Sequence, residues 1–368
     1  MKKTVIFVLV FFLFCNLCFV AATDNSAASA IVINARTRTV VYAKNAHEKR
    51  AMASTTKIMT ALLLAECATP QKRVTVTREM VAVEGSSMGL GVGDIVTYND
   101  LLYGILLPSG NDAANTAAIS IGGSIEKFAE LMNNRAAELG LKNTHFVTPS
   151  GLDADTHYTT AYDLAILASF ALENDDFRKA ASTKSIVLEY GGQKRYLANH
   201  NKMLRTYEGA IGVKTGFTSK AGRCLVSAAQ KGDTEIIVVT LNDKNDWHDH
   251  ANLLDYGFEN SNEVSVIPTI PNFINCVGGD SDKINIVTTA AGIGVSGEEE
   301  FNFITHLPSF LYAPVKSGDE IGFTDVYCDG YKIATLPIFA DSTVISCDNE
   351  NSFYNNVINL FLVMLRGL

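Results

Sequence analysis

At 368 residues the chain is long enough for two domains of ordinary size, each with a substantial hydrophobic core. Apolar residues make up 47% of the chain and charged residues 19%, which excludes an intrinsically disordered protein. The formal net charge is −9 and no Lys/Arg-rich run is present, which excludes nucleic acid as the main partner, because phosphate binding requires a basic surface.

The first 22 residues have the pattern of a secretory signal peptide. Lys2 and Lys3 precede an apolar stretch over residues 5–20, and the small residues Ala21 and Ala22 predict cleavage after Ala22. An uncleaved membrane anchor is the alternative, although the apolar stretch is short for a helix that spans a bilayer. We therefore expect the protein to be exported from the cytoplasm.

Residues 23–262 combine strands and helices. The residue patterns predict strands over 30–34, 39–43, 185–190, 223–229 and 235–241, and helices over 58–66, 101–107, 112–120, 161–171 and 248–256. This order favours an α/β (α+β) domain, an antiparallel sheet covered by helices. We expect the first and last strands of this domain to pair in one sheet.

The last third of the sequence has a different character. Residues 263–350 carry short alternating runs, at 264–267, 283–287 and 343–346, separated by Gly, Pro and Asp, which predicts a small all-β domain. Residues 351–368 predict an amphipathic C-terminal helix with its few polar side chains on one side. Such a helix is suited to lie in a membrane interface, and docking onto the preceding domain is the alternative.

Cysteine and histidine residues give no pattern typical of a metal site. The five cysteines after residue 22 include no C-x-x-C pair, which argues against a disulfide framework or zinc, although one bridge among Cys276, Cys328 and Cys347 stays open. His248 and His250 lack a third ligand at useful spacing, so we expect them to pack against or cap a helix. No metal and no cofactor are expected.

Three short motifs that carry chemistry occur in order along the chain. They are Ser54-Thr-Thr-Lys57, Ser109-Gly-Asn111 and Lys214-Thr-Gly216. A serine hydroxyl is a weak nucleophile until a base accepts its proton, and residues i and i+3 share one face of a helix. Lys57 is thus placed to act on Ser54, provided that burial and a second cation, which Lys214 could supply, lower its pKa from about 10.4.

The other residues of these motifs suit supporting roles. Ser109 can relay a proton to a leaving amine, and the Asn111 amide can hold Lys57 and the substrate backbone. Lys214 and the Thr215 hydroxyl can bind a substrate carboxylate.

Two further matches to catalytic motifs are weaker. Ser124-Ile-Glu-Lys127 repeats the S-x-x-K spacing in a polar helix, so the spacing alone does not identify a nucleophile. Residues 85–89 (GSSMG) match the nucleophile elbow but lack its preceding strand and following helix, and we expect a loop near the rim of a cleft.

Taken together, the motifs resemble those of the serine acyltransferases that bind penicillin. The stretches 53–60, 107–114, 139–146, 150–153 and 212–218 are similar to low-molecular-mass D-alanyl-D-alanine carboxypeptidases, and the likeness covers about residues 28–260. The resemblance implies a β-lactamase/transpeptidase-like catalytic domain, with a smaller β domain and a membrane-surface anchor after it.

Carried over residue by residue, the resemblance gives each position a role. Ser54 would be the nucleophile and Lys57 the general base, with Ser109 and Asn111 as the second catalytic element. Lys214, Thr215 and Gly216 would form a substrate-binding strand, and the backbone N–H groups of Ser54 and Phe217 would form the oxyanion hole.

The implied activity is removal of the terminal D-alanine from peptidoglycan stem pentapeptides through a Ser54 acyl-enzyme. β-Lactams would acylate the same serine, and the enzyme would work in the cell wall or on the extracytoplasmic face of the membrane. The alternatives are a serine β-lactamase, although residues 148–157 offer no matching glutamate motif, and a non-catalytic wall-binding relative.

One departure from the family pattern concerns the substrate carboxylate. Some relatives have an arginine after the strand that follows Lys-Thr-Gly, whereas residues 241–250 here contain none. Lys244 is a substitute to consider, and otherwise carboxylate binding rests on Lys214 and Thr215.

Overall fold

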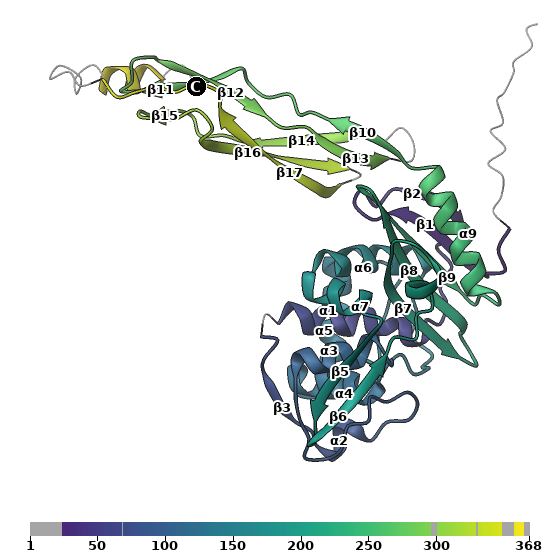
Figure 1. Ribbon diagram of the computed structural model, residues 1–368. Helices are drawn as coiled ribbons and strands as arrows, with labels where there is room; N and C mark the ends of the chain where they lie inside the picture. Colours follow the sequence, from purple (N-terminus) through teal and green to yellow (C-terminus); the bar gives the residue numbers. More distant parts are fainter. Residues whose placement is uncertain (1–23, 68, 296–299, 329, 348–356, 364–368) are drawn as a thin grey trace, which may run out of the picture.

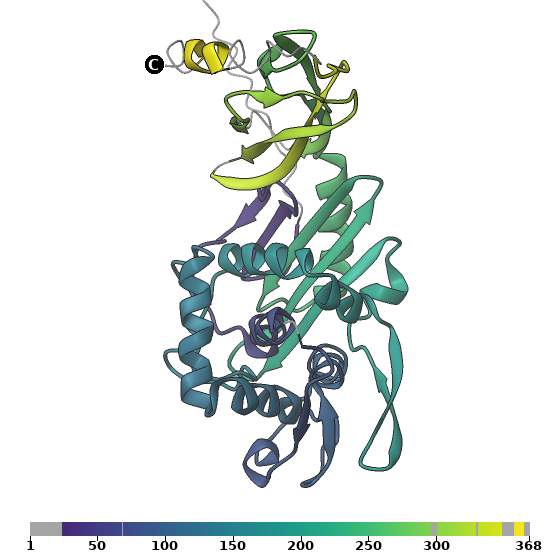
Figure 2. The same ribbon diagram turned by 90° about the vertical axis from the view of Figure 1, so that its left-hand side faces the viewer.

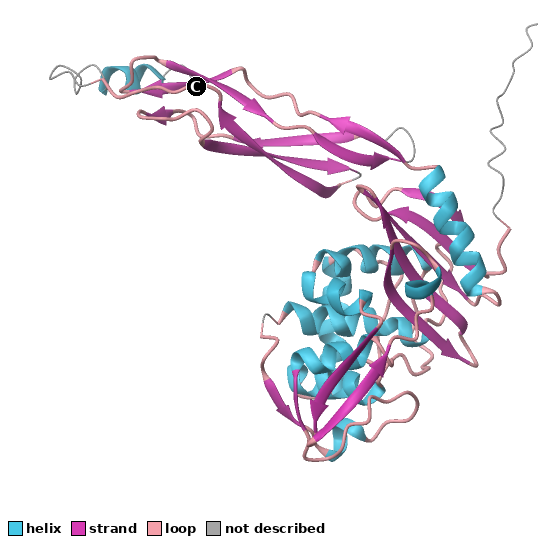
Figure 3. Ribbon diagram, viewed as in Figure 1, coloured by secondary structure: helices cyan, strands magenta, loops and turns pink. Residues whose placement is uncertain are grey.

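The protein is described from a computed structural model, which covers residues 24–67, 69–295, 300–328, 330–347 and 357–363. The predicted signal peptide over 1–22 lies outside these residues. The described elements form an α/β domain followed by a separate β domain (Figures 1 and 3).

The α/β domain contains, in chain order, β1 (Ser29–Asn34), β2 (Val40–Lys44), the 3-10 helix η1 (Ala53–Thr56), α1 (Lys57–Glu66), β3 (Arg73–Thr75), α2 (Arg78–Val81), β4 (Ile95–Thr97), α3 (Tyr98–Leu106), α4 (Asn111–Gly122), α5 (Ile125–Glu138), α6 (Ala161–Glu173), α7 (Asp175–Ser182), β5 (Ser185–Tyr190), β6 (Gln193–Ala198), α8 (Met203–Thr206), β7 (Ala210–Thr218), β8 (Gly222–Lys231), β9 (Thr234–Leu241) and α9 (Asp246–Glu259).

An antiparallel sheet in the order β2-β1-β9-β8-β7 forms the centre of this domain. β1 and β9, from opposite ends of the domain's sequence, pair along their length, from Ser29 opposite Leu241 to Asn34 opposite Ile236. The expected pairing of the first and last strands is therefore confirmed, as is the expectation of an antiparallel sheet covered by helices.

The central sheet is covered on both faces, which explains why its strands are apolar at almost every position. Successive side chains of a strand point to opposite faces. Ile31 and Ile33 thus belong to the large core with α1, α3, α4 and α6, while Val32 packs with Leu253 and Leu254 of α9. Figure 1 shows α9 on one side of the sheet and α1, α6 and α7 on the other.

A second hairpin, β5–β6, extends beyond the central sheet (Figure 2). Its first strand matches the prediction over 185–190, while β6 was not predicted, because Gln193–Ala198 is mostly polar. The Tyr190 hydroxyl donates to the Met88 carbonyl at 2.6 Å. The hairpin therefore supports the loop that contains residues 85–89.

The β domain contains β10 (Asn262–Val266), β11 (Phe273–Val277), β12 (Lys283–Thr288), β13 (Ala291–Val295), β14 (Phe301–His306), β15 (Leu311–Tyr312), β16 (Glu320–Cys328) and β17 (Tyr331–Ala340). Six of these strands form a sheet in the order β14-β16-β17-β12-β11-β15, and β10 pairs with β13. The predicted all-β character is confirmed.

The alternating run at 343–346 does not form a continuous strand. Val344 bridges Val315 and Ser346 bridges Gly279, so the segment meets two different partners once each and makes no continuous ladder. Its alternating pattern is explained by burial instead, because Val344 is 2% exposed while Ile345 is 58% exposed.

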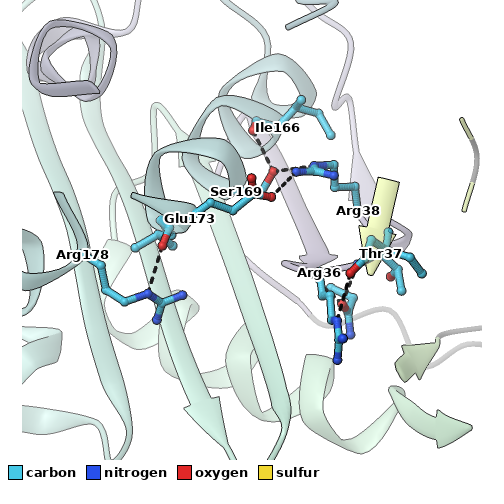
Figure 4. Close-up of polar contacts among 10 residues, drawn as sticks. Arg36, Thr37, Arg38, Ile166, Ser169, Glu173 and Arg178 are labelled. Atoms are coloured by element: carbon cyan, nitrogen blue, oxygen red, sulfur yellow. Dashed lines mark hydrogen bonds and ion pairs between the residues drawn. The ribbon is translucent and has the colours of Figure 1, made fainter. Parts of the chain in front are cut away.

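The turn between β1 and β2 contacts the β domain. The buried Arg38 donates to Ser169 at 3.0 Å and pairs with Glu173, and its guanidinium lies over Phe170 of α6 and Tyr331 of β17. Figure 4 shows Arg38 directed at Ser169 and Glu173, with Arg36 from the same turn nearby. One arginine thus ties the turn to α6 and to the β domain.

The C-terminal segment is described only in part. Within the predicted helix over 351–368, residues 357–363 are helical and the rest lies outside the described residues, so the full helix is not confirmed. Val357, Ile358, Phe361 and Leu362 are exposed. In the part of the chain that the structure describes, no helix has the length and apolar character needed to cross a bilayer.

Candidate active site

A pocket of about 320 Å³ lies at the edge strand β7, where the three predicted motifs meet. It is lined by Ser54, Ser86, Ser109, His200, Thr215, Gly216, Phe217, Arg223, Cys224, Asp246 and Trp247. These residues come from η1, the loop between α2 and β4, the loops before α4 and α8, the strands β7 and β8, and the first turn of α9. A larger cleft of about 410 Å³ lies between the two domains, but the residues lining it include no serine with a lysine bonded to it.

Ser54 lies in the 3-10 turn that leads into α1. The turn forms because the Thr55 N–H bonds to the Met52 carbonyl, and the hydroxyls of Thr55 and Thr56 bond to the carbonyls of Met52 and Ala53. No side chain caps the start of α1. The Ser54 hydroxyl is therefore available to Lys57 and to the pocket.

The Lys57 amine is completely buried and has three partners. Its Nζ lies 2.9 Å from Ser54 Oγ, 2.7 Å from Asn111 Oδ1 and 2.6 Å from the Ser150 carbonyl oxygen. Carbonyl oxygens can only accept, so two N–H bonds of the amine are committed to Asn111 and Ser150. In the neutral amine the remaining lone pair faces Ser54, which can donate its proton.

Two effects favour the neutral form of the Lys57 amine. Burial lowers its pKa well below the usual lysine value, and the positive charge of Lys214 lowers it further, while Asp112 opposes them. Lys214 is itself buried, and burial lowers its pKa to about 7. The sequence-based expectation that burial and a second cation act on Lys57 agrees with this arrangement.

Ser109 enters the pocket through an unusual backbone conformation. Its φ is +62°, and Ala53, just before Ser54, has a φ of +48°; non-glycine residues in this region are often found at functional sites. The Ser109 Oγ is buried and has no hydrogen-bond partner among the described residues. A substrate in the pocket could provide that partner.

Asn111 and Asp112 fix both the lysine and the loop over the pocket. Asn111 donates from Nδ2 to the Glu84 carbonyl at 2.6 Å, which turns its Oδ1 toward Lys57. Asp112 accepts from Ser87 Oγ and from the backbone N–H groups of Met88, Gly89 and Leu90. The motif at 109–111 therefore also holds the loop in place.

The strand β7 passes very close to Ser54. A Cβ at Gly216 would lie 3.1 Å from the backbone nitrogen of Ser54, so glycine permits this approach. Thr215 and Phe217 line the pocket, with Phe217 67% exposed, whereas Lys214 is buried and donates to the Thr215 carbonyl at 3.0 Å. The backbone N–H groups expected to form an oxyanion hole belong to these adjoining segments.

The weaker motif matches have structural explanations. Ser124 caps α5 by accepting from the Lys127 backbone N–H, and residues 85–89 form a loop that brings Ser86 to the pocket. His250 is buried between Ser227 and Thr240, and His248 contacts Asn252. The five described cysteines are free thiols.

Several pocket residues were not predicted from the sequence. His200, Arg223 and Asp246 line the pocket, and the Ser150 carbonyl binds Lys57. Lys244, the suggested substitute for a carboxylate-binding arginine, is exposed and is not among the residues that line the pocket. The pocket residues that were not predicted share only a position beside a motif in the folded protein. Finding them therefore requires the pairing register of the sheet.

Comparison with known proteins identifies the family. Residues 18–245 match the D-alanyl-D-alanine carboxypeptidase family, peptidase S11. The chain belongs to this family. It is 33% identical to D-alanyl-D-alanine carboxypeptidase DacF of Bacillus subtilis, covering 86% of this chain and 85% of the relative, and 32% identical to DacC of Escherichia coli, covering 92% and 88%.

Solved structures of D-alanyl-D-alanine carboxypeptidases and a DD-transpeptidase share the fold. The Streptomyces K15 DD-transpeptidase matches with a TM-score of 0.62 at 35% identity, covering 64% of this chain and 98% of that one. DacD of Francisella tularensis matches with a TM-score of 0.64 at 25% identity, covering 88% and 95%. The family and fold expected from the motifs are confirmed, and the protein is a serine-type D-alanyl-D-alanine carboxypeptidase.

Proposed function

We propose that Ser54 is the nucleophile of this carboxypeptidase and that Lys57 is its general base. The observation that carries the proposal is that Lys57 Nζ lies within hydrogen-bond distance of Ser54 Oγ and of two carbonyl oxygens. When the neutral amine donates its two N–H bonds to those oxygens, its lone pair faces Ser54. Burial and the charge of Lys214 lower the pKa of Lys57, which favours the neutral amine that can take the hydroxyl proton.

The reaction proceeds in two steps. Ser54 Oγ attacks the carbonyl carbon of the penultimate D-alanine while its proton passes to Lys57. The C–N bond then breaks, and the free D-alanine leaves with a proton that Ser109 relays. Water hydrolyses the resulting ester and restores the Ser54 hydroxyl. The backbone N–H groups of Ser54 and Phe217 stabilise the oxyanion of each tetrahedral intermediate, and one such donor is worth about 10²–10³ in rate.

The remaining pocket residues bind the substrate, the D-Ala-D-Ala end of a peptidoglycan stem peptide. Asn111 holds Lys57 and the peptide backbone, and Thr215 with Gly216 forms the strand along which the peptide lies. Lys214 supplies positive charge behind this strand. A β-lactam mimics the scissile peptide and acylates Ser54 without a leaving amine.

Labelling with a fluorescent penicillin tests the nucleophile. We expect Ser54→Ala to lose covalent labelling completely and to release no D-alanine from a D-Ala-D-Ala pentapeptide, while Ser124→Ala, the matched control, keeps both activities. A Ser54→Ala protein that is still labelled would reject the assignment. Turnover of the penicillin faster than the peptide would instead favour a β-lactamase.

We further propose that residues 1–22 direct export, that 23–262 and 263–350 are the catalytic and β domains, and that 351–368 bind the membrane surface. The exposed apolar residues at 357–362 support the last assignment. Cell fractionation with and without residues 353–368 tests it, and we expect the shortened protein to move to the soluble extracytoplasmic fraction. Unchanged membrane association would reject the anchor.

A further inference from the structure

The active-site pocket needs a cation for the C-terminal carboxylate of the substrate, and Lys214 is poorly placed for this. Lys214 is 1% exposed, donates to the Thr215 carbonyl and is not among the residues that line the pocket. Its pKa is lowered to about 7 by burial, and burial and Lys214 also lower the pKa of His200. Among the described residues that line the pocket, Arg223 is the one whose positive charge is permanent.

The pairing register of β7 and β8 places Arg223 on the same face of the sheet as Thr215 and Phe217. Arg223 of β8 lies directly opposite Phe217 of β7, and cross-strand partners project from the same face. Thr215, two residues before Phe217, shares this face and lies on the diagonal, about 7–8 Å away by Cα position. An arginine side chain can cover that distance, so its guanidinium can meet a carboxylate held by the Thr215 hydroxyl.

The start of α9 holds the Arg223 side chain beside the pocket. Arg223 Nη2 lies 2.9 Å from Asp246 Oδ2, while Asp246 Oδ1 accepts from the Trp247 backbone N–H at 3.0 Å. Both oxygens of the buried Asp246 are thus engaged, whereas the Arg223 side chain is 45% exposed and keeps further N–H donors. The guanidinium also lies 6.0 Å from the Trp247 ring.

Trp247 offers a second donor next to Arg223. Its indole N–H is buried and has no hydrogen-bond partner among the described residues, although the residue lines the pocket. A guanidinium and an indole N–H can only donate, so they suit an acceptor-only group such as a carboxylate.

We infer that Arg223, oriented by Asp246, binds the C-terminal carboxylate of the substrate together with Thr215. This inference rests on the proposed carboxypeptidase function and adds a specificity-determining residue that comes from β8. The carboxylate lies between β7 and the start of α9, and substrates that lack it lose this contact. Lys244, in the segment where relatives have their arginine, takes no part.

A pair of substrates with and without a carboxylate tests the inference. The first is a diacylated L-Lys-D-Ala-D-Ala tripeptide, and the second is the p-nitrophenyl ester of an N-acyl-D-alanine, whose leaving group has no carboxylate. We expect Arg223→Gln to lower kcat/KM for the tripeptide about 10- to 100-fold, the range for loss of a charged hydrogen bond, and to leave the ester nearly unchanged. Arg223→Lys should restore part of the loss, and Lys244→Gln should match the wild type on both substrates.

The outcomes distinguish a failure of the Arg223 inference from a failure of the proposed carboxypeptidase function. An equal loss on both substrates would mean that Arg223 supports the fold of the pocket, and no loss on the tripeptide would mean that the carboxylate binds elsewhere; either result overturns the inference. A wild-type protein that releases no D-alanine would instead reject the carboxypeptidase function. Stoichiometric penicillin labelling of Arg223→Gln confirms that the variant is folded.

Discussion

Lys57 and Lys214 are both buried at the active site. We assign them different roles because their surroundings differ. Lys57 has three hydrogen-bond partners that match a neutral amine, and Lys214 lies behind the strand β7. Burial is the larger cause of the lowered Lys57 pKa, and the Lys214 charge is the second. In the proposed mechanism, Lys214 thus influences Ser54 through the pKa of Lys57.

Replacing Lys214 should move the pH dependence of acylation. Without the second cation, the protonated form of Lys57 becomes less unfavourable and its pKa rises. The rate increases with pH as Lys57 loses its proton, so the acid limb of the profile should shift to higher pH in Lys214→Met. The acylation rate with fluorescent penicillin, measured from about pH 5 to about pH 10, gives the midpoint of this limb.

Lys220→Met is the matched control, because Lys220 lies in the exposed turn after β7 and pairs with Asp155. Its midpoint should equal that of the wild type. A Lys214→Met protein with lower rates but an unchanged midpoint would show that Lys214 does not influence Lys57.

At the scale of single residues, the side chains of the three motifs were predictable and their supports were not. Ser54, Lys57, Ser109 and Asn111 meet as expected, because their spacing and order identify them. Backbone acceptors such as the Ser150 carbonyl have no sequence signal, since every residue has one. Pocket residues such as Arg223 depend on which strand faces which, and that is decided by long-range pairing.

At the scale of elements, the loop over residues 148–153 positions the start of α1. The Ser150 carbonyl accepts from Lys57, and the Pro149 carbonyl accepts from the Thr60 hydroxyl at 2.7 Å. Gly151 has a φ of +85°, and a Cβ there would lie 2.0 Å from the Ala53 carbonyl oxygen. The loop therefore packs against the turn that carries Ser54 without room for a side chain.

An alanine at Gly151 should damage both stability and acylation. The positive φ alone costs about 1–2 kcal/mol for alanine, and the clash with Ala53 adds a packing cost, so we expect a loss of about 2–5 kcal/mol in the free energy of unfolding. Displacement of η1 should also slow penicillin labelling. Urea unfolding and labelling kinetics measure the two effects.

Gly123→Ala is the matched control, because it carries the cost of the positive φ without the clash. Gly123 has a φ of +84° at the end of α4, and nothing lies within 4 Å of its Cβ position. This variant should lose about 1–2 kcal/mol and label at the normal rate. Equal losses in the two variants would mean that the contact between the loop and η1 is unimportant.

The element pattern was predictable where strands and helices are apolar and long. The runs that became β1, β9 and α6 are buried nearly throughout, so their patterns were clear. β6 was missed because its residues are mostly polar and its pairing is local to a hairpin. The alternating run at 343–346 forms no strand, because an alternating pattern indicates which side chains are buried and does not require a neighbouring strand along its whole length.

At the scale of the whole molecule, the active-site pocket belongs to only one of the two domains. All residues that line the active-site pocket belong to the α/β domain, and none of them is among Arg36, Arg38 and Phe170, which contact the β domain. The K15 relative matches 98% of its length within 64% of this chain, so it has no counterpart for the remaining third. The composition and the residue patterns were enough to predict two domains. The contact between the domains could not be predicted, because it depends on where the turn of Arg38 lies in the folded protein.

A chain limited to residues 24–261 should therefore fold and keep its acylation rate. Truncation removes the Tyr331 ring from Arg38 and the Ile333 carbonyl from Arg36, whereas Arg38 keeps Ser169 and Glu173. Losing a cation–π contact of about 1–2 kcal/mol should lower Tm by about 2–8 °C. Calorimetry measures this change, and Tyr331→Ala in the full chain, which removes the ring alone, should account for much of it.

Labelling by fluorescent penicillin should stay within about twofold of the full chain, because distant sites act independently. A truncated protein that folds but is labelled slowly would show that the β domain supports the geometry of Ser54 and Lys57.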